Sequence, residues 1–321
     1  MRRRPARRRA WVAPTADVER RVVEGPAPLR LEGFVRALRP GLSRRLVRRL
    51  IAEGAVRING RPGHKGTLLQ PGDEVLLPPW PTLAPEADLD LAVVHVDAHL
   101  VVLDKPGGTP GHALDPRERG TAGAFVLGRW PETAAIGDPL APGLVHRLDT
   151  GTSGLLVAAR TAAAFAALRA AFRSRAIEKT YLAVVAGTPP RHARADTALA
   201  HDPRDRRRMA PARPGQRAWD AVTDVETLAV GRGRALVRAR MHTGVTHQIR
   251  AHLALLGHPV LGDALYGGPP APLAPGRHAL HAAGLVLPHP ADGVRIRLAS
   301  PLPADMQALA AVDSRLSTGL G

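Results

Sequence analysis

The sequence GLVHRLDTGTSGLLVAAR, residues 143–160, contains two apolar runs, GLVH and LLVAA, separated by a polar bend. Short apolar runs bounded by turn residues are typical of buried strands, so this stretch predicts a strand, a bend and a second strand. The bend would place Arg147 and Asp149 at the mouth of the two strands. Asp149 then has two interpretations. Its side chain caps the turn, or it is a catalytic group at an open site.

A second segment, MHTGVTHQIRAHLALLGHPVLGDALYGG at residues 241–268, predicts a helix. Thr246 is the expected N-cap and Gly257 the expected end of this helix. Arg250 would lie near its N-terminus, where the helix dipole disfavours a cation by about 0.3–1 kcal/mol. A nearby carboxylate would remove this conflict and would itself be held ionised. Asp149 is our candidate for that carboxylate, and the alternative is that Arg250 is an ordinary surface residue.

The chain of 321 residues has a formal charge of +17, from 45 Lys and Arg against 28 Asp and Glu. Residues 1–80 hold 18 basic and 7 acidic residues, so most of the excess charge lies near the N-terminus. This favours a polyanionic partner, and nucleic acid is favoured over a membrane because no amphipathic apolar helix accompanies the charge. No apolar run is long enough to span a membrane, and the basic N-terminus lacks the apolar core of a secretory signal. We therefore expect a cytoplasmic protein, with a monomer as the default.

Residues 29–78 predict a small α/β module. Two helical patterns break at residues 40–41, with Ser43 as the expected N-cap of the second helix and Gly54 as its stop. One side of this second helix carries four arginines with no acid among them, an arrangement in which the charges repel one another. Phosphates of a bound partner would supply the missing counter-charge. These arginines are Arg44, Arg45, Arg48 and Arg49.

This module resembles the RNA-binding domain first seen in ribosomal protein S-four. The resemblance rests on SRRLVRRLIAEGAVRING at residues 43–60 and on QPGDEVLL at residues 70–77. Helix, turn and strand signals follow the order of that domain over most of its length. The resemblance implies that the module binds RNA.

The sequence lacks the motifs of several other kinds of functional site. GRGRAL at residues 231–236 lacks the third glycine of a dinucleotide-binding loop, and no GxxxxGK[ST] phosphate-binding loop occurs. The chain has no cysteine, which excludes disulfides, thiolate nucleophiles and cysteine metal sites. No HExxH motif occurs, and His247 and His252 are spaced so that they would not share one ion on a helix. We therefore expect neither a cofactor nor a metal.

Four segments in the second part of the chain resemble, in this order, the RluA family of RNA pseudouridine synthases: HRLDTGTSGLL, KTYLAVVAG, TGVTHQIRAHLALLGHPVLGDALYGG and RHALHAAGL. KPGG at residues 105–108 and HDPRDRRRM at residues 201–209 also fit, and the similarity spans residues 90–303. The resemblance implies an α+β fold, with a catalytic domain built on a mixed, largely antiparallel sheet flanked by helices. It also implies isomerisation of uridine to pseudouridine in RNA without a cofactor. The combination with the small RNA-binding module resembles enzymes that act on large-subunit ribosomal RNA, and tRNA is the alternative substrate.

The resemblance implies a role for each matching residue. Asp149 would be the catalytic carboxylate, Arg250 its ionic partner and Tyr181 the ring that packs against the target base. Arg147 would fill the space left by the extruded nucleotide. Val245 departs from the family, which commonly has an arginine there, so the resemblance does not imply the RNA contact or local salt bridge of that arginine for this chain, while the carboxylate chemistry is unaffected. Besides the four arginines of the module, the expected RNA contacts are Lys65, Arg204, Arg206, Arg207, Arg208, His247 and Gln248.

Two other functions are compatible with these residues. A binding protein would use the basic module in ribosome assembly, with a catalytically silent second domain. A hydrolase would use Asp149 together with His146. The expected organisation is a flexible basic arm at 1–28, the RNA-binding module at 29–78, a Pro-rich linker at 79–90, the catalytic domain at 91–303 and a C-terminal tail at 304–321.

Overall fold

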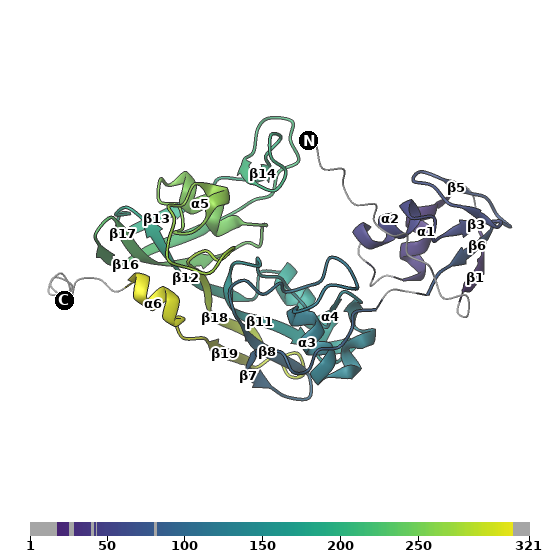
Figure 1. Cartoon of the computed structure of the whole chain (residues 1–321), viewed down its shortest axis with the longest axis horizontal. Coiled ribbons are helices and arrows are strands. Elements are labelled where there is room, and N and C mark those ends of the chain that lie inside the picture. Colours follow the sequence, from purple (N-terminus) through teal and green to yellow (C-terminus); the bar gives the residue numbers. More distant parts are fainter. Residues whose placement is uncertain (1–17, 26–28, 40–41, 43, 80–81, 311–321) are drawn as a thin grey trace, which may run out of the picture. The chain divides into compact units, whose positions relative to one another are not determined.

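The computed structural model describes residues 18–25, 29–39, 42, 44–79 and 82–310 (Figure 1). The chain forms two compact units that divide between Leu83 and Ala84, inside the Pro-rich segment, except that Gly137–Pro139 group with the first unit. Ser43, most of the expected N-terminal arm and residues 311–321 of the expected tail lie outside the described residues. Within the described part of the chain, no helix has the length and apolar character needed to cross a membrane.

The N-terminal unit combines two helices with a four-stranded sheet in the order β1-β6-β3-β4. The apolar side chains of the second helix recur at helical spacing and are buried. Residues 1–28 were expected to form a flexible arm, and this is wrong for β1, because its four residues pair with β6 along their whole length. The helices are α1 (Leu31–Leu38) and α2 (Arg44–Ala52), and the strands are β1 (Glu19–Val22), β2 (Leu29–Arg30), β3 (Arg57–Ile58), β4 (Arg61–Pro62), β5 (Leu68–Leu69) and β6 (Glu74–Leu77).

The arginine face of α2 has acidic partners that the pattern of α2 alone does not reveal. Glu32 of α1 lies 3.0 Å from Nε of Arg44 and 2.8 Å from Nε of Arg48. Arg49 pairs with Glu53 one turn further along α2. Such exposed ion pairs contribute little to stability, but they reduce the repulsion among the arginines. The arginine face is therefore partly neutralised within the protein, and phosphates are not required to explain how α2 folds.

The second unit, which the resemblance predicts to be catalytic and which is called the catalytic unit below, is built on one nine-stranded sheet. Its main path runs β13-β16-β17-β12-β18-β11-β8-β7, with β19 paired to β18. Strands β11 and β18 are parallel, and every other pairing in this sheet is antiparallel. The expected mixed, largely antiparallel sheet is confirmed. Its strands are β7 (Ala92–Val96), β8 (Leu100–Lys105), β11 (Ser153–Ala159), β12 (Glu178–Ala186), β13 (His192–Ala195), β16 (Thr223–Gly231), β17 (Arg234–Met241), β18 (Leu280–Pro288) and β19 (Arg295–Ala299).

Helices flank this sheet, as expected for the α+β class (Figure 1), and the chain also forms two short hairpins. Thr161 caps α4, since its hydroxyl accepts a hydrogen bond from the Ala164 amide. The helices are α3 (Ala122–Arg129), η1 (Pro131–Ala135), α4 (Ala162–Arg173), α5 (Gln248–Leu255), η2 (Ala264–Tyr266) and α6 (Ala304–Ala310). The hairpins are β9 (Gly137–Asp138) with β10 (Ala141–Pro142), and β14 (Leu199–His201) with β15 (Met209–Pro211).

Strand β11, the second apolar run of the opening segment, is buried along its whole length. Because side chains alternate along a strand, Leu156 and Ala158 join one core while Leu155 and Val157 join the other, beneath α4. The first run is not the regular strand that we expected. It forms a single β-bridge, between Leu144 and Ala158. The rest of this run has no regular secondary structure and continues into the polar bend.

The expected C-terminal boundary of the catalytic domain, at residue 303, is wrong because helix α6 follows it. Residues 304–310 were expected to belong to a tail, but Met306 and Leu309 are almost completely buried in the main core of the catalytic unit. Asp305 pairs with Arg277, which is 4% exposed. The catalytic unit therefore extends at least to residue 310.

Gly154 provides a test of the parallel junction between β11 and β18. Its φ is +109°, and an added Cβ would lie 2.3 Å from the backbone oxygen of Ala282. We expect Gly154→Ala to lower the free energy of unfolding by at least about 2 kcal/mol, because both the backbone conformation and the close approach require glycine. The matched control is Gly284→Ala on β18, where a Cβ would meet neighbours only at ordinary contact distances. Denaturant unfolding of both variants measures the difference, and equal stabilities would contradict the argument.

Candidate active site

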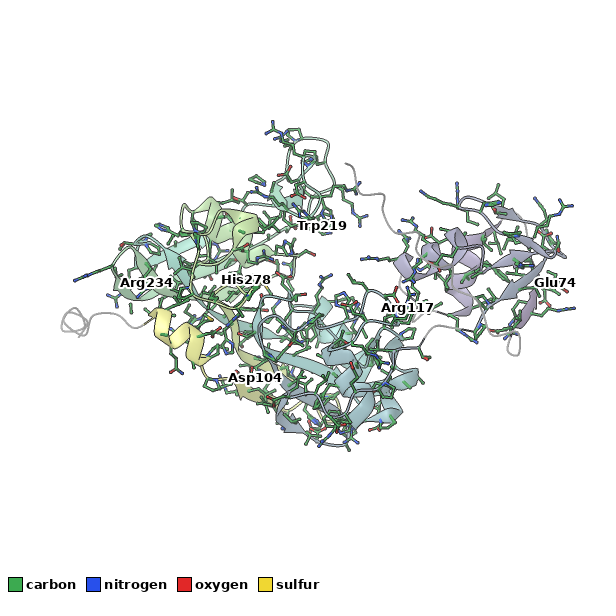
Figure 2. All side chains as sticks on the ribbon, in the orientation of Figure 1. Glu74, Asp104, Arg117, Trp219, Arg234 and His278 are labelled. Carbon is green, nitrogen blue, oxygen red and sulfur yellow. The ribbon has the colours of Figure 1, made fainter. Side chains whose placement is uncertain are left out.

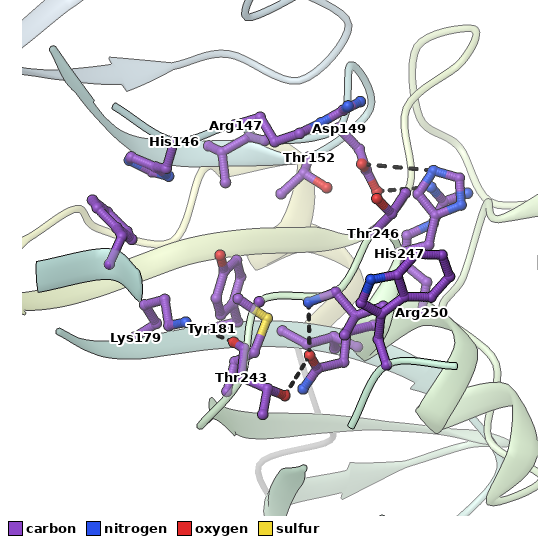
Figure 3. Close-up of a pocket in the computed structure, with 18 of the residues that line it drawn as sticks. His146, Arg147, Asp149, Thr152, Lys179, Tyr181, Thr243, Thr246, His247 and Arg250 are labelled. Atoms are coloured by element: carbon purple, nitrogen blue, oxygen red, sulfur yellow. Dashed lines mark hydrogen bonds and ion pairs between the residues drawn. The ribbon is translucent and has the colours of Figure 1, made fainter. Parts of the chain in front are cut away.

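The opening segment and the second segment of the sequence meet at a cavity of about 710 Å³ in the catalytic unit (Figure 3). Its walls come from the bend before β11, the end of α4, the start of β12 and the stretch from the end of β17 into α5. The structure therefore brings together six of the expected site residues. They are Arg147, Asp149, Tyr181, His247, Gln248 and Arg250.

Asp149 lies between two nitrogen-bearing side chains at this cavity. Its Oδ2 accepts a hydrogen bond from Nη1 of Arg250 at 2.8 Å, and its Oδ1 lies 3.6 Å from Nε2 of His247 (Figure 3). The carboxylate side chain is 17% exposed, so it is largely enclosed but still reachable from the cavity. The expected ion pair between Asp149 and Arg250 is present.

Asp263 is the residue of this cluster that the sequence analysis missed. Nε and Nη2 of Arg250 donate to the two carboxylate oxygens of Asp263 at 2.6 Å and 2.8 Å. Asp263 is 2% exposed, and the Tyr266 ring centre lies 5.1 Å from the guanidinium carbon. Arg250 is therefore held from one side by a buried carboxylate and an aromatic ring, and its remaining nitrogen is directed at Asp149. Asp263 lies within the family-like LGD stretch, which was the available signal.

These contacts determine the charge of Asp149. Burial by itself would raise the pKa of Asp149, but the neighbouring positive charges and the hydrogen bond from Arg250 hold it below its ordinary value. Burial lowers the pKa of His247, and the charge of Asp149 opposes this shift. Burial alone would also lower the pKa of Arg250, but the bond to Asp263 and the charge of Asp149 raise it. At neutral pH the site therefore contains an ionised carboxylate beside a permanent guanidinium.

The entrance to α5 differs from the expected one. His247, not Thr246, occupies the N-cap position, with a left-handed φ of 54° and without a side-chain capping bond. The amide of Gln248 holds this turn instead: its oxygen accepts from Thr243 Oγ1 at 2.7 Å and from the Val245 amide at 3.1 Å. Its nitrogen donates to the Val222 carbonyl and to Thr223 Oγ1. Gln248 is 1% exposed and fully bonded within the protein, so the expected RNA contact by its side chain is corrected to a structural role.

Tyr181 and Arg147 form parts of the wall around Asp149 (Figure 3). Tyr181, on β12, is 7% exposed, and burial raises the pKa of its hydroxyl, so the phenol stays neutral. Arg147 is exposed at the rim. Val245 also lines the cavity, so the departure from the family motif lies at the site itself.

Two buried cations hold the backbone that follows Asp149. Nζ of Lys105, in the KPGG stretch, donates to the carbonyls of Pro106, Thr109 and Thr150. Burial lowers the pKa of this ammonium to about 7. Nη1 of Arg277 donates to the carbonyl of Gly151 at 2.9 Å and to two carbonyls of its own segment. The bend that carries Asp149 is thus bonded at both of the following residues, 150 and 151.

The wall of the cavity at the end of α4 is cationic, and the sequence analysis did not predict it. Arg169, Arg173, Arg175 and Lys179 line this wall. Nζ of Lys179 donates to the Thr243 carbonyl, and burial together with the charge of Arg175 lowers its pKa to about 8. No ion pair involves these four side chains within the described parts of the chain. The wall therefore presents positive charge to whatever enters the cavity.

The remaining expected RNA contacts lie outside this cavity. Arg206, Arg207 and Arg208 belong to the loop between β14 and β15, where Arg207 is paired with Asp205 and the guanidinium carbon of Arg208 lies 5.4 Å from the Tyr266 ring centre. Lys65 and the arginines of α2 belong to the N-terminal unit. Across residues 18–310, with the gaps given above, no three His, Asp or Glu side chains are grouped as a metal site would require.

Comparison with known proteins gives a consistent result. Residues 99–255 match a family model described as RNA pseudouridylate synthase, and residues 29–75 match an S4 domain. A relative from Chloroflexus aurantiacus, named an uncharacterized RNA pseudouridine synthase, is 40% identical over 303 residues, which cover 91% of this chain and 93% of the relative. Relatives named ribosomal large subunit pseudouridine synthase D include those of Xanthomonas campestris, 36% identical, and Pseudomonas aeruginosa, 32% identical; each alignment covers 90% of this chain and at least 90% of the relative. The structure of human RNA pseudouridylate synthase domain containing 1 aligns with a TM-score of 0.55 at 25% identity, covering 70% of this chain and 90% of that chain.

Proposed function

The chain belongs to the RluA family of RNA pseudouridine synthases, and from this premise we propose that it converts uridine to pseudouridine in large-subunit ribosomal RNA, with Asp149 as the catalytic carboxylate. The substrate is supported by the relatives from Xanthomonas campestris and Pseudomonas aeruginosa, whose names specify the ribosomal large subunit. It is also supported by the RNA-binding S4 domain that precedes the catalytic unit.

The reaction explains which groups the site needs. Pseudouridine forms when the bond between N1 of uracil and the ribose breaks, the base turns, and C5 of uracil bonds to the ribose in place of N1. No atom is gained or lost overall. A carboxylate can promote this as a nucleophile on the ribose or on the base, or as a base that removes a proton from the sugar. Each of these routes requires the carboxylate to be ionised, as Asp149 is at neutral pH.

A uridine reaches Asp149 only after leaving its stack, which costs a few kcal/mol. In the proposed complex, the ring of Tyr181 packs against the extruded base, and Arg147 at the rim occupies the space that the base vacates. The cationic wall at the end of α4 would meet the RNA backbone, since phosphate contacts supply affinity and register in such complexes. The S4 domain would add affinity from a second part of the RNA.

One observation supports this proposal most directly: a carboxylate held ionised by a buried guanidinium at the wall of a cavity that is open to solvent. A carboxylate that only capped a turn would need neither the arginine nor the second carboxylate behind it. The arrangement also favours an enzyme over a protein that only binds RNA. Burying three charged groups in one cluster costs folding free energy, and such clusters are typical of catalytic sites.

The proposal is tested by mapping pseudouridines in total RNA from the source organism with and without the gene. We expect one or a few pseudouridines of large-subunit ribosomal RNA to disappear on deletion and to return when the wild-type gene is restored. Complementation with the Asp149→Asn gene should not restore them. Loss of pseudouridine from transfer RNA alone, or from no RNA, would contradict the proposed substrate.

A further inference from the structure

Trp219 lines the same cavity as Asp149, and none of the assigned roles uses it. It lies in the segment between β15 and β16, and its side chain is partly buried (Figure 2). The chain has only four tryptophans, two tyrosines and four phenylalanines. A large aromatic side chain at the wall of an RNA-binding cavity is therefore an uncommon feature of this sequence.

The structure holds Trp219 in place through its backbone. Its amide donates to the Leu199 carbonyl and its carbonyl accepts from the Leu199 amide, both at 2.9 Å, so the residue is tied to β14. The side chain packs at the border of a small core that contains Leu199, Ala221 and Tyr266. The indole is thus positioned before any ligand binds, which lowers the entropy cost of using it as a contact.

An arginine and a histidine ring flank this indole, and arginine beside an aromatic ring is also found in surfaces that bind single-stranded nucleic acid. The guanidinium carbon of Arg217 lies 5.4 Å from the indole ring centre, and His201 meets the ring edge-on with centres 5.7 Å apart. The exposed Arg217 has no ion pair within the described residues. Aromatic rings flanked by arginine bind nucleotides because the ring stacks on the base while the cation meets the phosphate.

The cavity has room for such a contact. Its volume of about 710 Å³ exceeds what one nucleoside fills, and Tyr181 already supplies the wall for the target base in the proposed complex. Trp219 and Tyr181 line the cavity from different segments, the one between β15 and β16 and the other on β12. A second base entering beside the target would therefore find an aromatic surface that the target base does not occupy.

We propose that Trp219 is a stacking site for the base of a nucleotide adjacent to the target uridine in the substrate RNA. This inference rests on the proposed function, since it assumes that the target uridine lies at Asp149. Extrusion of one nucleotide disrupts the stack of its neighbours, and stacking on Trp219 replaces part of the interaction that a neighbour loses. The site would hold either purines or pyrimidines, because every base presents a flat face for stacking.

The test measures RNA binding by the full-length protein and does not depend on turnover. The probes are pentauridylate and five derivatives, each with one base removed to leave an abasic ribose. In the wild-type protein, removal of one particular neighbour base is expected to weaken binding about ten-fold, consistent with the stacking of one base. In Trp219→Ala the same removal should change binding less than two-fold, and Trp219→Phe should restore most of the effect.

Controls separate this role from a structural one. Arg234→Gln changes a cation at the β16–β17 turn, well away from Trp219 (Figure 2), and should keep the wild-type response to every probe. If Trp219→Ala unfolds, tryptophan fluorescence tests the same contact. We expect pentauridylate to quench the emission of the wild type, and we expect this quenching to be lost in Trp219→Phe. The inference is overturned if the abasic effects are equal in the wild type and in Trp219→Ala, or if no probe binds. Loss of pseudouridine from the wrong RNA in the gene deletion would contradict the proposed function while leaving this result intact.

Discussion

Asp149→Asn is expected to lose at least about a thousand-fold in the rate of pseudouridine formation while it still folds and binds RNA. An amide has the shape of the carboxylate but neither its charge nor its basicity, so it serves neither as the nucleophile nor as the proton acceptor. Loss of an essential group of this kind commonly costs several powers of ten in rate. The amide oxygen can still accept the hydrogen bond from Arg250, so the wall of the cavity should persist.

The measurement is single-turnover pseudouridine formation on ribosomal RNA, with RNA affinity and thermal unfolding measured on the same preparations. The matched control is Asp220→Asn, because Asp220 also lines the cavity but is exposed and has no role in the proposed chemistry. We expect this control to stay within a few-fold of the wild type. A rate within ten-fold of wild type for Asp149→Asn would refute the assignment of Asp149.

Arg250→Met should cause the second large effect, on stability and on pH dependence together. Without the guanidinium, the carboxylates of Asp149 and Asp263 lose the cation that both contact. Breaking a buried ion pair by removing one partner typically costs about 3–5 kcal/mol, because a charge is left buried without compensation. We expect a loss of this size in the free energy of unfolding, measured by denaturant titration at pH 7.

The pH dependence follows from the direction of the pKa shift. In the wild type the pKa of Asp149 lies below its ordinary value, so the active, ionised form persists down to acidic pH. The associated stability is present above the pKa of the unfolded state and is lost as the pH falls through the pKa of the folded state. Removal of the Arg250 charge raises the pKa of Asp149. The acid limb of the activity profile should therefore move to higher pH in Arg250→Met.

Two further variants make this prediction specific to the ion pair. Arg250→Lys retains the charge but not the fork of donors, so it should be intermediate in stability and keep the acid limb near its wild-type position. Arg173→Met removes another arginine of the same cavity, one that is exposed at the end of α4, and should cost less than about 1 kcal/mol. An Arg250→Met protein with wild-type stability and an unmoved acid limb would show that the cluster does not control the charge of Asp149.

Much of the local structure was predictable because it depends on neighbouring residues. An apolar run beside turn residues predicted β11, and helical spacing predicted α2 and α5. The position of Arg250 near a helix N-terminus indicated that a carboxylate was nearby, and the structure places Asp149 there. Errors occurred where pattern and tertiary contacts disagreed: GLVH is irregular, His247 replaces Thr246 at the N-cap, and residues 19–22 and 304–310 are structured.

The local elements, the resemblance to a family and the identity of the charged groups could be predicted from the order of the residues. The surroundings of those groups could not, because such contacts join residues that are far apart along the chain. Asp263 holds Arg250 from behind, Glu32 neutralises part of the α2 arginine face, and the end of α4 supplies a cationic wall. Trp219 reaches the cavity because its backbone is bonded to β14, twenty residues earlier. The physical reason is that strand pairing and side-chain packing place these partners, and neither has a periodic signal in the sequence.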